Sequence, residues 1–220
     1  MGITKSSALS RNLALRVALL LTGVSLALAA CSTGDAPGHD YSTGTVQIRE
    51  FKVRTGEFTA LFHAESEPAR VGSGNLTNDG RFTWNLNTPA QTALVNASDL
   101  FGEGVTVQPA DLRIALAHEF YDESTDSNIE HAVIYGTSSG LHAYEQGTRI
   151  GLLVYADRDA TVEFATEYEK GTVGLTRGWN VLAGEIVGVD SDDIAHTRYQ
   201  TGSIADLYFY HHYRDWSQRQ

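Results

Sequence analysis

Residues 74–86 read GNLTNDGRFTWNL, and this stretch decides the fold class. Its middle, Asn78-Asp79-Gly80, is a turn signal, because these residue types tolerate the positive φ angles that a tight hairpin needs. After the turn, apolar and polar residues alternate, with Phe82, Trp84 and Leu86 on the apolar side. A period of two predicts a strand with one buried and one hydrated face.

Short segments of the same kind continue on both sides of this hairpin. Clear examples are residues 58–62, 112–116, 150–155 and 160–165. The sequence predicts about ten short strands, with turn signals roughly every 8–15 residues and no long segment of helical period. We therefore expect an all-β domain over residues 45–216, an antiparallel β-sandwich with a β-barrel as the alternative.

Three stretches are less regular. A single helical turn is expected at residues 98–101, within the looser segment 88–111, and a short helix within residues 138–147. Residues 188–203 are polar and acidic, and the sequence assigns no strand to them.

The hairpin resembles the prealbumin-like sandwich modules of bacterial surface proteins. The likeness consists of a strand, an Asp-Gly turn and an aromatic strand over Gly74–Leu86. It covers this one hairpin and assigns no family to the domain.

The N-terminal segment is typical of a secretory signal. Residues 1–16 carry Lys5, Arg11 and Arg16 and no acidic residue, and residues 17–30, VALLLTGVSLALAA, carry no charge. A cationic start followed by a short apolar run is the pattern of an export signal. At about 1.5 Å per residue the run spans roughly 21 Å, too little for a bilayer core of about 30 Å.

The end of that segment, Leu28-Ala29-Ala30-Cys31, resembles the lipobox of bacterial lipoproteins. In that family the cysteine thiol is linked to diacylglycerol and the chain is cleaved before the cysteine. The resemblance covers about the first 31 residues. It implies a signal peptide over residues 1–30 and a lipidated N-terminal Cys31 as the membrane anchor. Ser32, in place of an aspartate, favours the outer membrane where the cell has two membranes.

Residues 32–44, STGDAPGHDYSTG, are rich in Gly, Ser and Thr, and we expect residues 31–44 to form the lipidated cysteine and a flexible spacer. Cys31 is the one cysteine of the chain, so an intramolecular disulfide is excluded. The formal net charge of −11 argues against nucleic acid and anionic membrane surfaces as partners.

Gly136-Thr137-Ser138-Ser139-Gly140 fits the G-x-S-x-G pattern of serine hydrolases. Downstream acids and histidines would supply the remaining members of a triad: Asp157, Asp159, Asp190, His196, His211 and His212. That elbow belongs to a parallel sheet with crossover helices, and the chain shows almost no helical pattern. An envelope hydrolase using Ser138 is therefore the alternative function, and a plain loop is the preferred interpretation.

Metal sites are the third possibility. His63, Glu65 and Glu67 would share one face of a strand, although a hydrated strand face explains them equally well. Asp190-Ser191-Asp192-Asp193 fails the calcium-loop pattern, because Ala195 stands where that loop needs glycine.

The terminal aromatic residues allow two interpretations. Tyr208, Phe209, Tyr210, Tyr213 and Trp216 would form either part of the core or a platform for carbohydrate or peptide, and core packing is preferred. The sequence therefore predicts a cell-envelope lipoprotein with a non-catalytic binding or structural domain, without cofactor or metal.

Overall fold

The computed structural model describes residues 40–50, 55–63, 68–117, 119–122, 129–140 and 144–215. All of them belong to the unit Gly34–Gln220. The lipobox residues Leu28, Ala29 and Ala30, and Cys31 itself, lie outside the described residues.

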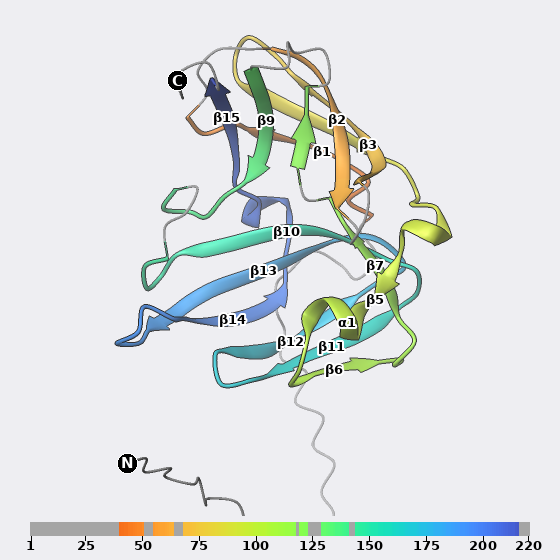
Figure 1. Cartoon of the computed structure of the whole chain (residues 1–220), viewed down its shortest axis with the longest axis vertical. Helices are drawn as coiled ribbons and strands as arrows, with labels where there is room; N and C mark the ends of the chain where they lie inside the picture. Colours follow the sequence, from red (N-terminus) through yellow and green to blue (C-terminus); the bar gives the residue numbers. More distant parts are fainter. Residues whose placement is uncertain are drawn as a thin grey trace, which may run out of the picture. The chain divides into compact units, whose positions relative to one another are not determined.

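The fold is all-β, as the sequence predicts, and its strands form two curled sheets that pack as a β-sandwich (Figure 1). Among the described residues, seven strands make the first sheet, in the order β1-β4-β3-β2-β8-β9-β15. Their bounds are Thr43–Gln47 (β1), Arg81–Leu86 (β4), Pro68–Leu76 (β3), Gly56–His63 (β2), Glu119–Tyr121 (β8), Ile129–Tyr135 (β9) and Phe209–Asp215 (β15).

The second sheet has the order β5-β7-β10-β13-β14-β12-β11-β6. Its strands are Val95–Asn96 (β5), Arg113–Leu116 (β7), Arg149–Ala156 (β10), Gly178–Val189 (β13), Ala195–Thr201 (β14), Glu169–Leu175 (β12), Ala160–Ala165 (β11) and Val105–Gln108 (β6). Among the described strand ladders, the pairing of β12 with β14 departs from the expected antiparallel arrangement, because these strands run parallel, with Glu169 opposite Thr197.

The hairpin at residues 74–86 forms as predicted. β3 and β4 pair antiparallel, and Gly80 adopts a φ of 78° in the turn between them. The alternating residues Phe82, Trp84 and Leu86 are 0%, 1% and 4% exposed. The turn chemistry and the period of two therefore specify the same structure.

The two edges of the first sheet come together. Arg49, which follows β1, donates a backbone hydrogen bond to Phe209 O over 3.0 Å and bridges to Tyr210 of β15. β1 begins at Thr43, inside the range assigned to the spacer, and Tyr41 is already 6% exposed. Regular structure thus starts before residue 45.

The second sheet is also curled. Its two edge strands, β5 and β6, are connected by a short helix. This helix, α1 (Ala97–Phe101), links β5 to β6 and confirms the helical turn expected at residues 98–101. It ends at Gly102, whose φ of 82° favours glycine over other residues. Two 3₁₀ turns, Gln91–Ala93 (η1) and Ile204–Asp206 (η2), complete the described helical structure.

Two apolar cores result from this arrangement. We call the first the inter-sheet core; its main members are Phe82, Trp84, Phe120 and Phe209 from the first sheet and Leu153, Tyr155, Trp179 and Val181 from the second. We call the other the concave core, inside the curl of the second sheet; its main members are Val107, Leu112, Ile114, Val154, Val162, Phe164, Val173, Leu175 and Leu182. β10 and β13 contribute to both cores, which explains why residues 150–155 read as a continuous apolar run.

Candidate functional site

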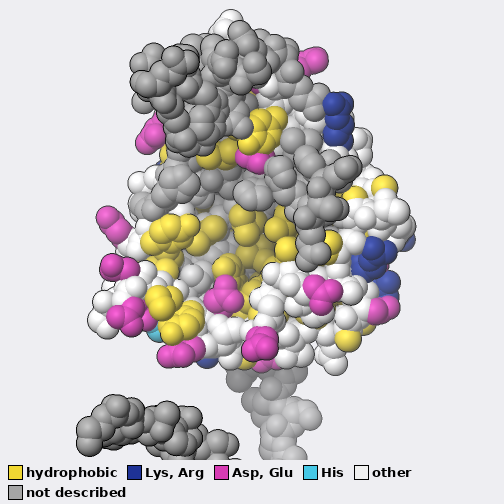
Figure 2. Space-filling model, viewed as in Figure 1, with side chains coloured by type: hydrophobic (Ala, Val, Ile, Leu, Met, Phe, Trp, Pro, Cys, Tyr) yellow, Lys and Arg dark blue, Asp and Glu magenta, His cyan; other side chains and the backbone are white. Residues whose placement is uncertain are grey.

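The concave core is not completely filled. It contains a cavity of about 240 Å³, lined by Leu100, Phe101, Leu116, Leu152, Val154, Phe164, Glu169, Leu182 and Tyr199. The space-filling view shows apolar side chains gathered in a hollow on this side of the molecule, with acidic side chains around it (Figure 2). Concave, mostly apolar sites with few polar groups are the usual form of a small-molecule site.

Strand pairing places two of the cavity residues, Phe164 and Tyr199, in one row across the sheet. Phe164 of β11 pairs with Gly171 of β12, Gly171 with Tyr199 of β14, Tyr199 with Gly184 of β13, and Gly184 with Ile150 of β10. Paired residues share one face of a sheet, so glycines flank Tyr199 on both sides. A methyl group on Gly184 would lie 3.0 Å from Tyr199 Cε1. The absence of a side chain at Gly184 therefore leaves space for the Tyr199 ring.

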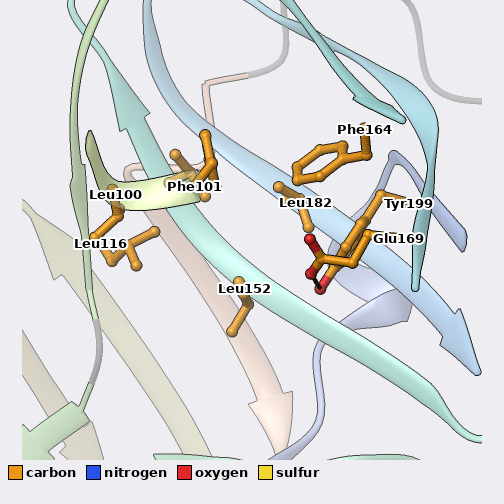
Figure 3. A pocket seen from close by; sticks show the side chains of 9 residues that line it. Leu100, Phe101, Leu116, Leu152, Phe164, Glu169, Leu182 and Tyr199 are labelled. Atoms are coloured by element: carbon orange, nitrogen blue, oxygen red, sulfur yellow. Dashed lines mark hydrogen bonds between the residues drawn. The ribbon is translucent and has the colours of Figure 1, made fainter. Parts of the chain in front are cut away.

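The opposite side of the cavity is formed by α1. Leu100 is 40% exposed at the rim, and the Phe101 ring lies edge-on to the Phe164 ring, with centroids 5.4 Å apart. Figure 3 shows Leu100, Phe101 and Leu116 on one side, Phe164, Tyr199 and Glu169 on the other, and Leu152 and Leu182 between them. The cavity thus combines one helical turn with strands from both halves of the sheet.

One polar pair interrupts the apolar lining. Tyr199 Oη donates a hydrogen bond to Glu169 Oε1 over 3.2 Å (Figure 3). The Phe164 and Tyr199 rings are tilted against each other at 4.5 Å. Burial, and after it the negative charge of Glu169, raises the pKa of Tyr199 above its usual range. Tyr199 therefore stays a neutral donor at physiological pH, and Glu169 is the acceptor.

Glu169 is positioned by the turn that precedes β12. Its backbone N donates a hydrogen bond to Thr166 Oγ1 over 2.8 Å, which anchors the start of the strand. Among the described residues that line the cavity, Glu169 is the one acidic side chain, and no Lys, Arg or His lines it. The site can therefore hold an apolar body and offers one carboxylate at its wall.

Ser138 lies in a tight turn between β9 and β10. Its Oγ accepts a hydrogen bond from the backbone N of Arg149 over 2.8 Å, and its backbone N donates to Arg149 O over 2.8 Å. Within the described part of the chain, no hydrogen bond joins Ser138 to a histidine or an acidic side chain. The hydroxyl holds the turn against β10, and residues 138–140 and 144–147 form turn and loop structure where a short helix was expected.

No group of three or more His, Cys, Asp or Glu residues within the described residues could hold a metal ion. In the acidic loop between β13 and β14, Asp190 Oδ1 accepts hydrogen bonds from the backbone N of Asp192 and of Ile194, each over 2.9 Å. That carboxylate is therefore used to shape the turn. Glu65 and Glu67, and the side chain of His63, lie outside the described residues.

The terminal aromatic residues pack in the core. Tyr208, Phe209 and Tyr210 are 4%, 1% and 2% exposed, as the preferred interpretation predicts. His211 is buried and its neighbour His212 half-buried, because successive residues of β15 point to opposite faces. The side chains of Tyr213 and Trp216 lie outside the described part.

A second hollow lies where the chain enters the domain. It measures about 340 Å³ and is more polar, with Asp40, Ser42, Thr88 and Arg177 among its lining residues. Asp40 Oδ1 accepts backbone hydrogen bonds from Ser42 N at 3.1 Å and Trp179 N at 3.2 Å. These bonds fix the start of the domain, so we assign this hollow a structural origin.

The sequence did not predict the apolar cavity. Its polar residues, Glu169 and Tyr199, come from β12 and β14, and β14 falls within residues 188–203, to which the sequence assigns no strand. The only local signal was a weak alternation over Ala195–Thr201, in which Tyr199 shares a side with the buried Thr197.

No known protein family, no curated protein and no solved structure matches this chain. In the part of the chain that the structure describes, no helix is long and apolar enough to cross a membrane.

Proposed function

We propose that this chain is a cell-envelope lipoprotein whose β-sandwich domain binds a small apolar ligand without catalysis. Lipid on Cys31 anchors it outside the cytoplasm, on the outer membrane where there are two. The observation that carries the binding function is the apolar cavity of about 240 Å³ in the concave core.

The tether rests on the N-terminal sequence. Each CH₂ group buried in a bilayer contributes about 0.8 kcal/mol, and a single acyl chain holds a protein only marginally. A lipoprotein cysteine carries at least two chains, which is enough for stable anchoring. The spacer then separates the domain from the membrane surface.

The binding function rests on the state of the concave core. Protein interiors are normally filled to the density of organic crystals, and an empty apolar cavity costs stability. A ligand that fills this cavity removes apolar surface from water at roughly 25 cal/mol per Å². An open end between α1 and the sheet, marked by the exposed Leu100, supplies access.

Two tryptophan variants test ligand binding. The full chain, in detergent-free lipid nanodiscs, is titrated with 2-phenylethanol and followed by saturation-transfer NMR, with empty nanodiscs as the blank. Leu152→Trp places an indole in the cavity and is expected to abolish the protein-dependent signal. Val187→Trp adds the same group at an exposed position of β13 and is expected to retain it. No signal with the wild type, or equal loss in both folded variants, would contradict the assignment.

The tether is tested by Cys31→Ser. We expect the wild type in the membrane fraction, with an intact mass that shows cleavage before Cys31 and added acyl chains, and the variant in the soluble fraction. A wild-type chain that starts at Met1, or carries no acyl mass, would remove the anchor from the proposal.

A separate experiment tests the proposal that the domain is not a serine hydrolase. A fluorophosphonate probe is expected to leave the protein unlabelled. Labelling that disappears in Ser138→Ala would instead establish a serine hydrolase.

A further inference from the structure

Among the described residues that line the cavity, one is charged, and its position indicates which ligand groups the cavity would favour. Glu169 lies at the wall beside Tyr199 and Phe164, and the other described lining residues are uncharged. Glu169 is half-buried, and the part of its carboxylate that faces the apolar space needs a donor or a cation beside it. Tyr199 Oη supplies one donor, at 3.2 Å from Oε1.

Tyr199 holds the carboxylate in place without neutralising it. A phenol donates a hydrogen bond but brings no positive charge, so the charge of the Glu169 carboxylate is not cancelled by Tyr199. A carboxylate has about four acceptor positions, and one hydrogen bond leaves others able to accept.

The neighbouring rings favour the same kind of ligand group. The Phe164 and Tyr199 rings both line the cavity with Glu169, and they lie against each other, with centroids 4.5 Å apart. A cation is attracted to such faces, and an anion is not. The whole chain, at a formal net charge of −11, also raises the local concentration of cations over anions.

We propose that the cavity selects small apolar ligands that carry one ammonium group, and that Glu169 is the residue that recognises this group. The apolar body lies against Leu152, Leu182 and Phe101, and the ammonium donates a hydrogen bond to the Glu169 carboxylate. This inference rests on the proposed ligand-binding function and specifies its ligand class.

A matched ligand series tests it. Three compounds share the phenylethyl body: 2-phenylethylamine, 2-phenylethanol and 3-phenylpropanoate. Their dissociation constants are measured by NMR titration against the full chain in detergent-free nanodiscs, with empty nanodiscs subtracted. We expect the ammonium to bind on the order of tenfold more tightly than the alcohol, and the carboxylate to bind most weakly. The advantage of the ammonium should shrink as salt is raised.

Two variants identify the recognising residue. Glu169→Gln keeps an oxygen acceptor for Tyr199 Oη but removes the charge, so the ammonium should lose its advantage while the alcohol binds as before. Glu163→Gln makes the same change at an exposed position of β11, on the opposite face from Phe164, and should leave all three affinities unchanged.

Each outcome decides one question. Equal binding of the ammonium and the alcohol, or tightest binding of the carboxylate, overturns the ligand class and leaves apolar binding standing. An ammonium preference that survives in Glu169→Gln overturns the role of this residue. No binding of any of the three compounds overturns the ligand-binding function itself.

Discussion

The inter-sheet core and the concave core share two strands but are packed differently. In the inter-sheet core, aromatic rings fill the space, with the Phe82 and Phe120 centroids 4.8 Å apart and Trp84 and Phe209 at 5.5 Å. The concave core is largely aliphatic and leaves a cavity of about 240 Å³. On β10, Leu153 is 0% exposed in the filled core, and its neighbour Leu152 lies at the cavity.

This difference indicates how much each core contributes to the stability of the fold. The inter-sheet core contains side chains from both sheets, so the apolar surface buried there stabilises the whole fold. The concave core is enclosed only by the curl of one sheet and by α1, and part of its volume stays unfilled. We expect substitutions in the two cores to differ in their effect on stability even where the side chains are identical.

The largest expected difference is between Phe82→Ala and Phe164→Ala. Phe82 is 0% exposed and its ring contacts those of Phe58, Phe120 and Phe209, so its removal creates an enclosed cavity. We expect Phe82→Ala to lower the free energy of unfolding by about 3–5 kcal/mol. Phe164 is 4% exposed, but Phe164→Ala enlarges a cavity that is already present, so we expect a smaller loss, of about 3 kcal/mol or less.

Urea unfolding of the full chain, followed by tryptophan fluorescence, measures both values. Equal losses of unfolding free energy in the two variants would contradict the claim that the inter-sheet core is more tightly packed than the concave core. A larger loss in Phe164→Ala would reverse the assignment of which core supports the fold.

Glycines give a second, smaller contrast. A methyl group on Gly74 of β3 would collide with the Phe82 ring and lie 3.1 Å from Phe120 Cδ1, with a filled core behind them. We expect Gly74→Ala to destabilise the fold by about 1–3 kcal/mol through overpacking. A methyl group on Gly184 would lie 3.0 Å from Tyr199 Cε1 and 3.1 Å from Thr197 Cγ2; the Tyr199 ring borders the cavity and has room to shift, and only a small adjustment is needed at Thr197.

For Gly184→Ala we therefore expect a change of less than about 1 kcal/mol, since the smaller entropy of the unfolded chain offsets part of the crowding. The same urea titration measures both glycine variants. The ring shift should also weaken binding of 2-phenylethanol, which Gly74→Ala should leave unaltered in any molecules that remain folded. A Gly184→Ala variant as unstable as Gly74→Ala would mean that Tyr199 is held as rigidly as Phe82.

The filled core could be predicted from the sequence because its signals are local. The turn at Asn78-Asp79-Gly80 and the alternation of Phe82, Trp84 and Leu86 lie within one hairpin. The burial of each of these residues can therefore be predicted from its place in the apolar–polar alternation.

The cavity could not be predicted in the same way, because it depends on register between distant strands. Phe164, Tyr199 and Gly184 come together only through the pairing of β11, β12, β14 and β13. One of these pairings is parallel, which no hairpin signal specifies. Glu169 is polar and lies at the start of a strand, so its sequence context is that of an ordinary hydrated residue.

The smallest expected effect concerns the alkaline limit of stability. Burial, and then the charge of Glu169, raises the pKa of Tyr199 in the folded state above the 10.0 of a free tyrosine. The folded chain therefore holds this proton more tightly than the unfolded chain does. The resulting stabilisation is complete below pH 10 and is lost as the pH rises toward the folded-state pKa.

In Tyr199→Phe this alkaline loss should be smaller, with a difference from the wild type of less than about 1 kcal/mol between pH 9 and 11. Urea titrations across that range measure it, and absorbance at 295 nm should show one fewer late-titrating tyrosine. Glu169→Gln serves as the partner variant, because removal of the negative charge should lower the pKa of Tyr199 while burial keeps it raised. If Tyr199→Phe and the wild type lose stability in parallel above pH 10, Tyr199 is as hydrated as an unfolded residue. The wall of the cavity beside Glu169 would then be open to water, and the concave core would be less closed than the packing of Tyr199 against Phe164 indicates.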